Sequence, residues 1–258
     1  MIAYFRRDFI SYFKTPIGYI VLGIVALIGG FYLANGIGYG YVNIIEEIYF
    51  IQNTLFLVIP LITMRLLSEE KKNGTDVLMH VSPISLNRVV IAKYFSALAL
   101  FSIICCIIVF HAVVAYSIGA TITADTFGFF VSFFFIGSVY LSIGILASAL
   151  TENQIISAIS CLTVIFFSQF IPVLAGQIKS FTFSFMSSFN IFGLSSANTY
   201  KIASRLEKII LWFDPYSKFD SYYAGIVTLS PIIFSISIIF VFLFITYRVI
   251  EKRRWSQK

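Results

Sequence analysis

Six long apolar stretches constrain this 258-residue chain more than any other feature of its sequence. Each has about twenty residues or more with few charges, the length of helix that crosses about 30 Å of hydrocarbon. The composition agrees, because 59% of the residues are hydrophobic and only 12% are charged, far from the average of soluble domains. The stretches cover residues 17–39, 47–67, 89–119, 126–150, 154–175 and 225–248. We therefore predict a polytopic membrane protein.

The same stretches indicate an all-α fold. A membrane β-barrel would alternate apolar and polar residues in short segments, whereas residues 155–174 and 232–245 are apolar on every side. We predict one transmembrane domain over residues 1–258, with six transmembrane helices.

The basic residues predict the orientation. Thirteen of the eighteen Lys and Arg residues fall on one side of the membrane if both termini are cytoplasmic. The other five lie in one outer loop, residues 176–224, and long loops cross membranes largely regardless of charge. We expect a cytoplasmic-membrane protein with a cytoplasmic tail at 249–258. The basic residues are dispersed along membrane boundaries, so the net charge of +6 does not indicate nucleic-acid binding.

Few titratable groups are expected inside the spans. Arg65 and Lys93 lie near enough to the cytoplasmic boundary to snorkel to water, which leaves His111, and we expect no buried carboxylate. Proton-coupled carriers and intramembrane hydrolases need such groups, so their absence argues against both classes. His111 is either a proton relay or a side chain bonded to a neighbouring helix. The three cysteines read as apolar fillers, and no metal site is expected.

The connection after the second span holds the most informative polar segment. Pro60 predicts a bend one turn before Arg65, and these two residues are candidates for a gating hinge. Beyond that bend, residues 68–72 should continue the helix into water until Asn73-Gly74, a pair that tolerates left-handed backbone and so ends it. Thr75 can then cap a new short helix that closes at Pro83.

That new helix exposes apolar residues outside the membrane. Val77, Leu78 and Met79 have no lipid around them if the segment lies in water. Such a helix either fits a groove in a partner or rests on the lipid surface, and the residues alone leave both alternatives open.

Two further segments are predicted to lie at the membrane surface. Residues 1–14 place aromatic and basic side chains at helical spacing, which is typical of an interfacial helix on the inner side. Within 197–213, Ala203, Leu206 and Ile210 form one stripe while Lys201, Arg205 and Lys208 form another, so this segment should lie on the outer surface.

Small residues recur on two of the spans. They are Gly137, Gly144, Ser148, Ser157, Cys161 and Ser168. Stripes of this kind allow close contact between helices, either within one subunit or between two subunits.

Four short motifs carry a resemblance to a known family. Thr63-Met64-Arg65, Glu69-Glu70-Lys71-Lys72, Gly74-Thr75 and Ser82-Pro83 together resemble the signature of ABC-2-type permeases, the membrane subunits of ATP-binding-cassette transporters. Residues 12–19, 150–154 and 213–255 are similar to the gliding-motility and nitrous-oxide-reductase-maturation branch of that family. Residues 176–212 match no motif of the branch.

The resemblance implies a coupling helix at about 75–82, seated in a cleft of a separate ATPase and supported from the side by the N-terminal helix. The residues implied in this ATPase coupling are Glu69, Glu70, Lys71, Gly74, Thr75, Val77, Leu78, Met79 and Pro83. Two ATPase subunits and a second permease, identical or related, would complete the complex.

The resemblance also implies the energy source and the activity. The chain has no Gly-x-x-x-x-Gly-Lys-Ser/Thr loop, so ATP and Mg would be bound by the partner and no cofactor by this chain. The implied function is export of an unidentified substrate by a subunit that is not itself an enzyme. One alternative is ATP-driven mechanical work on an extracytoplasmic partner. Another, from a different class, is a membrane enzyme or ion-coupled carrier without an ATPase.

Overall fold

The computed structural model of this chain describes residues 1–76, 85–189, 195–212 and 214–256. These residues form helices and no strand, which confirms the all-α prediction. Six of the helices are long and apolar enough to cross a membrane. The helices are α1 Ile2–Lys14, α2 Pro16–Gly38, α3 Ile44–Thr63, α4 Ser68–Lys72, α6 Leu86–Ser117, α7 Ala124–Leu150, α8 Gln154–Phe189, α9 Ser196–Leu211, η1 Ser217–Phe219, α10 Asp220–Tyr223 and α11 Leu229–Ser256.

Short polar turns set the boundaries of the long helices. Thr15 is extended, and Pro16 begins α2 at a position where its missing N–H has no helical partner to lose. The Asn43 side chain accepts a hydrogen bond from Ile45 N at 3.0 Å and so caps α3. Asn153 caps α8 in the same way through Ile155 N, at 2.9 Å. The α7–α8 turn is three residues long, from Thr151 to Asn153.

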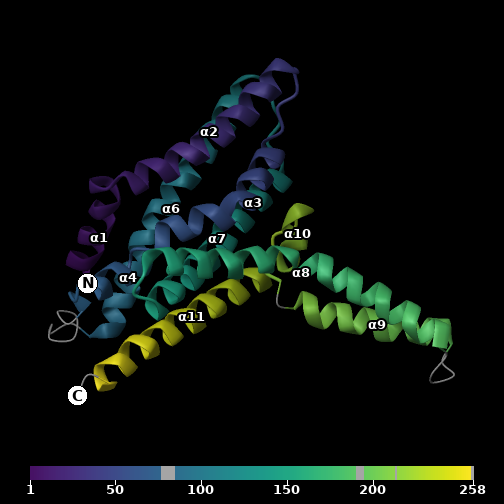
Figure 1. Cartoon of the computed structure of the whole chain (residues 1–258). Helices are drawn as coiled ribbons and strands as arrows, with labels where there is room; N and C mark the ends of the chain where they lie inside the picture. Colours follow the sequence, from purple (N-terminus) through teal and green to yellow (C-terminus); the bar gives the residue numbers. More distant parts are fainter. Residues whose placement is uncertain (77–84, 190–194, 213, 257–258) are drawn as a thin grey trace.

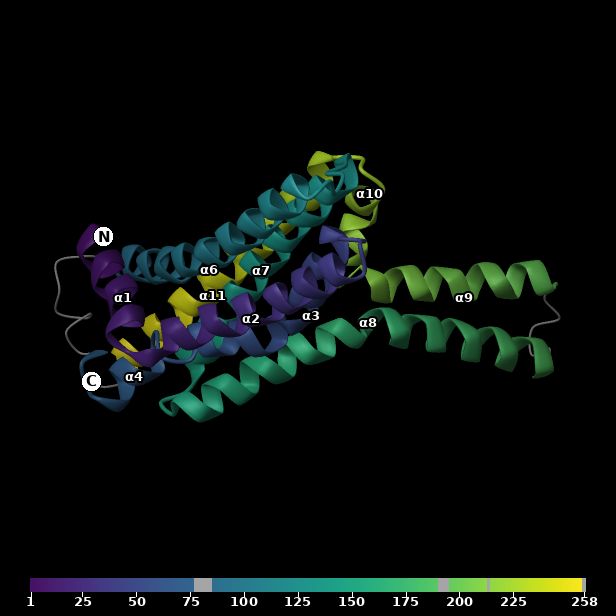
Figure 2. The same ribbon diagram turned by 90° about the horizontal axis from the view of Figure 1, so that it is seen from above.

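The long helices form a bundle around α7, as Figures 1 and 2 show. α7 packs against α3, α6, α8, α10 and α11. In its apolar window 61% of residues are buried, compared with 17% in α8 and in α11. We call the end of the bundle with α4 and both termini the terminal end, and the end with the α2–α3 and α6–α7 turns the far end (Figure 1).

Small residues of α7 and α8 pack inside this bundle. A Cβ at Gly137 would lie 2.1 Å from the Phe101 ring of α6, and a Cβ at Gly144 would lie 2.3 Å from Thr63 Oγ1 of α3. Ser148, Ser157 and Cys161 are buried in the same subunit, and Ser168 contacts Tyr140 at 3.3 Å. Packing within the subunit is therefore confirmed for these residues. A contact between two permeases through any of these residues stays a prediction.

The segment before the last span folds back against the far end of α7. Phe219 and Tyr222 are fully buried there, and α10 packs on α7. The Asp214 carboxylate accepts hydrogen bonds from Tyr216 N at 3.0 Å and Ser217 N at 2.9 Å. Burial raises the pKa of Asp214, and these backbone bonds oppose that change. The segment between α9 and α11 thus has a folded structure of its own.

α8 and α9 depart from the expected outer loop. We predicted that the fifth span ends near residue 175, but α8 continues through Pro172 to Phe189. α9 packs along this second half and returns toward the bundle, so the two helices form an antiparallel hairpin that projects from the far end (Figures 1 and 2). The expected helix at 197–213 is therefore present, and one of its sides packs on another helix.

Candidate functional site

We predicted that the second span bends at Pro60 and continues as a helix to Asn73-Gly74, but the structure has a break between α3 and α4. Pro60 is buried in the last turn of α3, the helix ends at Thr63, and α4 begins at Ser68. Arg65, within the break, donates from Nε and Nη2 to the two carboxylate oxygens of Glu69, both at 2.7 Å. This bidentate pair joins the break to α4.

α7 supplies the hydrogen bonds that the broken helix lacks. The Ser148 hydroxyl accepts from Leu67 N and Ser68 N, each at 3.0 Å, and donates to Met64 O at 3.3 Å. Lys71 of α4 donates to Ala149 O, also on α7. Backbone groups left unpaired in a buried helix break are costly, so these bonds fix the position of α4 against the end of α7.

The Asn73-Gly74 pair ends α4, as the sequence predicts. Gly74 has φ of +67°, Thr75 N donates to Glu70 O at 2.9 Å, and Gly74 N donates to Lys71 O at 3.1 Å. These two bonds are the pair that closes a Schellman motif, in which glycine is favoured because it adopts positive φ without a steric penalty. Asp76, the next residue but one, is again helical and is buried.

Four charged side chains join three helices beside this turn. We call them the polar cluster: Arg7 and Asp8 of α1, Glu70 of α4 and Lys93 of α6. Lys93 Nζ lies 3.1 Å from Asp8 Oδ2, 3.0 Å from Glu70 Oε2 and 2.6 Å from Leu66 O. The ammonium group donates hydrogen bonds to Asp8 Oδ2 and Leu66 O, whereas its contact with Glu70 is an ion pair.

Arg7 completes the polar cluster from its exposed side. Its Nε donates to Asp8 Oδ1 at 2.9 Å, and its Nη2 pairs with Glu70. Partial burial opposes the charged form of Arg7, but Asp8 and Glu70 raise its pKa above the ordinary value. The prediction that Lys93 snorkels to water is wrong, because Lys93 is 1% exposed and finds two carboxylates within the protein.

α1 is held by its buried side. The Phe5 ring stacks on Phe9 at a centroid distance of 5.9 Å, and Phe9 meets Phe13 edge to face at 5.4 Å. Asp8 and Tyr12 are buried on its inner side. Burial raises the pKa of Tyr12 far above its usual range, so this phenol stays protonated and donates to Ile62 O at 2.9 Å. This bond joins α1 to the end of α3, and α1 packs against α6 and α2.

A cavity of about 380 Å³ lies between α1, the α3–α4 break and α6. One wall is polar, with Arg65, Glu69 and the polar cluster, and the other is apolar, with Ile17 and Leu61. The charged side chains in its walls are paired with one another, so a partner side chain that enters the cavity would meet a balanced set of charges.

The structure brings together most of the predicted coupling residues that it describes. Glu69, Glu70, Lys71 and Gly74 lie on one five-residue helix and its terminal turn, beside Arg65. The predictions for Val77, Leu78, Met79 and Pro83 lie outside the described residues. Sequence reasoning missed Asp8 as the partner of Lys93. A carboxylate in the middle of the interfacial helix was the available signal.

A second ionisable pair lies near the far end and was also missed. His111 Nδ1 of α6 lies 2.5 Å from Glu47 Oε1 of α3, and Glu47 is 1% exposed. We expected no buried carboxylate inside the spans, and this expectation is wrong because α3 begins at Ile44 and buries Glu47. The alternative in which His111 is bonded to a neighbouring helix is confirmed. The argument against ion-coupled carriers rested on the absence of a buried carboxylate, so it no longer holds.

The comparisons with known proteins bear on the whole chain. A model of the ABC-2 family transporter proteins matches residues 6–255. The comparison with curated proteins gave no match. The narrower resemblance to the gliding-motility and nitrous-oxide-reductase-maturation branch stays a prediction. From residue 6 to residue 255, the sequence and its six-span helical fold place this chain in the ABC-2 family of transporter membrane proteins.

Proposed function

We propose that this chain is the permease subunit of an ABC exporter in the cytoplasmic membrane, and that a separate ATPase subunit binds its terminal end. Both chain termini and α4 lie at that end (Figure 1). The distribution of Lys and Arg favours a cytoplasmic position for it. The ATPase would contact the surface that continues from α4 into residues 75–83.

The polar cluster is the observation that carries this proposal. It ties α4 to α1 and α6, because Glu70 of α4 pairs with the half-exposed Arg7 and with the buried Lys93. Removing the carboxylate partners of Lys93 costs about 3–5 kcal/mol, because the ammonium group stays buried. A movement imposed on α4 would therefore be transmitted to α1 and α6.

The composition of the complex follows from the energy source. Two ATPase subunits would each bind ATP and Mg and contact one permease, so a second permease, identical or related, would pair with this chain. This chain would bind no cofactor and hydrolyse no ATP. The six spans would then change their exposure to the two sides of the membrane as the ATPases close and open.

The test is the double substitution Leu78→Asp and Met79→Asp. We expect the variant to enter the membrane at normal abundance and to lose the ATPase subunit on purification from native membranes, because an apolar contact surface becomes charged. The matched control is Thr121→Asp with Ile122→Asp, two exposed residues of the α6–α7 turn at the far end, which should retain the ATPase. Retention by the first variant, with ATP turnover unchanged, contradicts the proposal.

A second candidate function is mechanical work on a partner outside the membrane. The projecting α8–α9 hairpin favours it, since a helix continuous from the bundle could move such a partner (Figure 2). Crosslinking from positions on the hairpin in whole cells would distinguish the two. A crosslinked partner, without solute movement in vesicles that hold the complete complex, would support mechanical work.

A further inference from the structure

An apolar stripe along α8 is longer than the hydrocarbon core of a membrane is thick. The helix has 36 residues, about 54 Å at 1.5 Å per residue. One stripe of exposed side chains, spaced three or four residues apart, runs for about 44 Å of this length, whereas the hydrocarbon core is about 30 Å thick. The stripe consists of Ile156, Ile159, Thr163, Phe167, Phe170, Leu174, Ile178, Phe181 and Phe185.

The contacts between α8 and α9 show which side of each helix faces the other. Ala175 of α8 and Ala203 of α9 are both fully buried. Lys179 Nζ pairs with Glu207 at 2.8 Å and lies 5.2 Å from the centre of the Tyr200 ring. The facing residues are thus 175 and 179 on one helix and 203 and 207 on the other.

The exposed apolar residues come immediately before these facing positions on both helices. Leu174 and Ile178 precede 175 and 179, and on α9 Ile202 and Leu206 precede 203 and 207. One residue earlier is a rotation of about 100° in the same sense on each helix. Because the two helices run antiparallel, that rotation turns both stripes to the same side of the hairpin. The hairpin therefore has one apolar side made by both helices.

The side of the hairpin opposite the apolar one is mostly polar, and the exposed Ile209 lies among the basic residues on the outer edge of α9. Ser180 and Ser187 of α8 and Ser204 and Lys208 of α9 lie opposite the apolar side, by the same helical geometry. Lys201 and Arg205 leave α9 on the edge away from α8, and both are exposed. Aromatic residues, basic edges and one apolar side are typical of helices that lie in a membrane interface.

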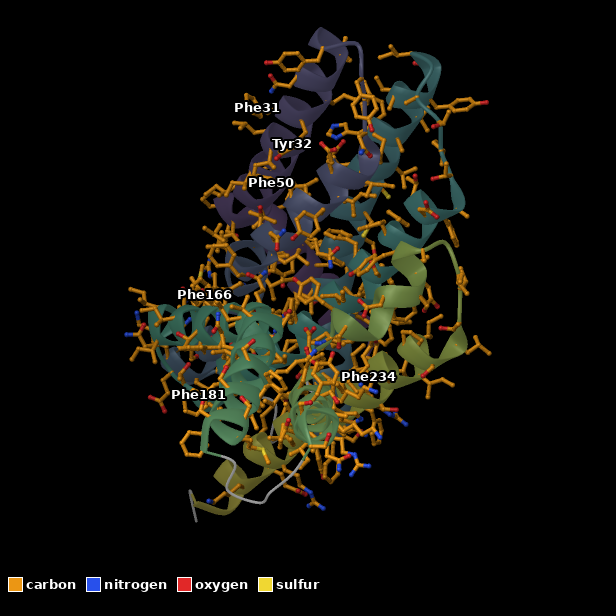
Figure 3. The ribbon with its side chains drawn as sticks, turned by 90° about the vertical axis from the view of Figure 1, so that its right-hand side faces the viewer. Phe31, Tyr32, Phe50, Phe166, Phe181 and Phe234 are labelled. Carbon is orange, nitrogen blue, oxygen red and sulfur yellow. The ribbon has the colours of Figure 1, made fainter. Side chains whose placement is uncertain are left out.

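The orientation of the hairpin agrees with this chemistry. Figure 1 shows α8 and α9 running obliquely to α2 and α11, so the hairpin does not continue the axis of the bundle. Figure 3, seen from the hairpin side, places Phe181 on the same side of α8 as Phe166, which lies in the spanning half. The apolar side of the hairpin thus continues the exposed stripe of the first half of α8.

We infer that the α8–α9 hairpin is a lateral arm that lies in the interface of the far-end leaflet, with its apolar side on phospholipid acyl chains. Lys201, Arg205 and Lys208 then reach the headgroup phosphates, which complement their charge. Lying obliquely in the leaflet lets the long stripe stay in hydrocarbon, whereas an upright helix would carry several large apolar side chains into water. The inference does not depend on the ATPase, because the position of the hairpin can be measured on the permease alone.

Tryptophan fluorescence tests the inference. In a background with Trp212→Phe and Trp255→Phe, single tryptophans are placed on the apolar side by Phe181→Trp or Leu206→Trp. The matched controls on the opposite side are Tyr200→Trp and Ser204→Trp. The proteins are reconstituted in vesicles of phosphatidylcholine and phosphatidylglycerol with acyl chains brominated near the headgroup, and iodide serves as the aqueous quencher.

We expect brominated lipid to quench most of the fluorescence of Phe181→Trp and Leu206→Trp and little of that of the two controls. Iodide should give the reverse order. Equal quenching of all four by iodide would place the hairpin in water and overturn the inference. Shielding of the first two tryptophans from both quenchers would also overturn it, because protein rather than lipid would then cover the apolar side.

Discussion

Glu47 and His111 join α3 to α6 through one buried contact near the far end. Their 2.5 Å contact leaves Glu47 Oε2 without a hydrogen bond among the described residues. α2 comes against the pair at Gly29, where a Cβ would lie 2.6 Å from Glu47 Oε1. Removing one member of the pair therefore leaves the other as a buried polar group without a partner, which costs free energy. Neither water nor another side chain can easily take the place of the missing partner.

A double-mutant cycle would measure this coupling. We predict that Glu47→Leu and His111→Leu each destabilise the protein more than the double variant does, because each single change strands a buried polar group. The coupling free energy should reach about 1 kcal/mol or more, above the average for side-chain hydrogen bonds between membrane helices. Reversible unfolding in mixed detergent micelles gives the values, with Glu47→Gln as the control that keeps a hydrogen bond. Additive single effects would show that the contact contributes no specific free energy.

α4 depends on the conformation of one residue at its end. Gly74 has positive φ, which costs an ordinary L-residue about 1–2 kcal/mol. A Cβ at Gly74 has no neighbour within 4 Å, so a substitution there tests backbone conformation without introducing a clash. The turn sets the direction in which the chain leaves α4 toward residue 76.

We predict that Gly74→Val lowers ATP turnover in the complete complex, because a β-branched residue redirects the chain beyond α4. Gly74→Asn should retain most of the activity, since asparagine tolerates left-handed backbone. Comparison of ATP hydrolysis by the two purified complexes, at equal permease content, is the measurement. If both variants turn over ATP equally, the direction of this turn does not matter for coupling.

The sequence predicted the helices well and their polar contacts poorly. Apolar runs and the turns at Thr15-Pro16, Asn73-Gly74 and Asn153 depend on local chemistry, so they could be located without a fold. The partners of Lys93 and His111 could not, because Asp8 and Glu47 are 85 and 64 residues away in the chain. The length of α8 was missed because its second half is stabilised by α9, a contact that local propensity does not report.

The whole bundle is assembled around close approaches of α7 to its neighbours. We predict that Gly144→Leu destabilises the permease by about 1–3 kcal/mol or prevents its folding, as overpacked cores do, because Thr63 lies where the side chain would go. Gly176→Leu is the matched control, since a Cβ there meets nothing within 4 Å. Thermal unfolding and the oligomeric state in detergent are measured together. A change in oligomeric state at unchanged stability would instead return Gly144 to a contact between subunits.

The hydroxyl of Ser148 has a consequence for how torque would pass through the molecule. It holds both amides at the start of α4, and Lys71 adds a second bond to the same end of α7. α4 therefore cannot rotate independently of α7, although the helix is broken between residues 63 and 68. A rotation of α4 must either break these hydrogen bonds or move α7, the least exposed of the six spanning helices. The permease should respond as a stiff lever with few joints.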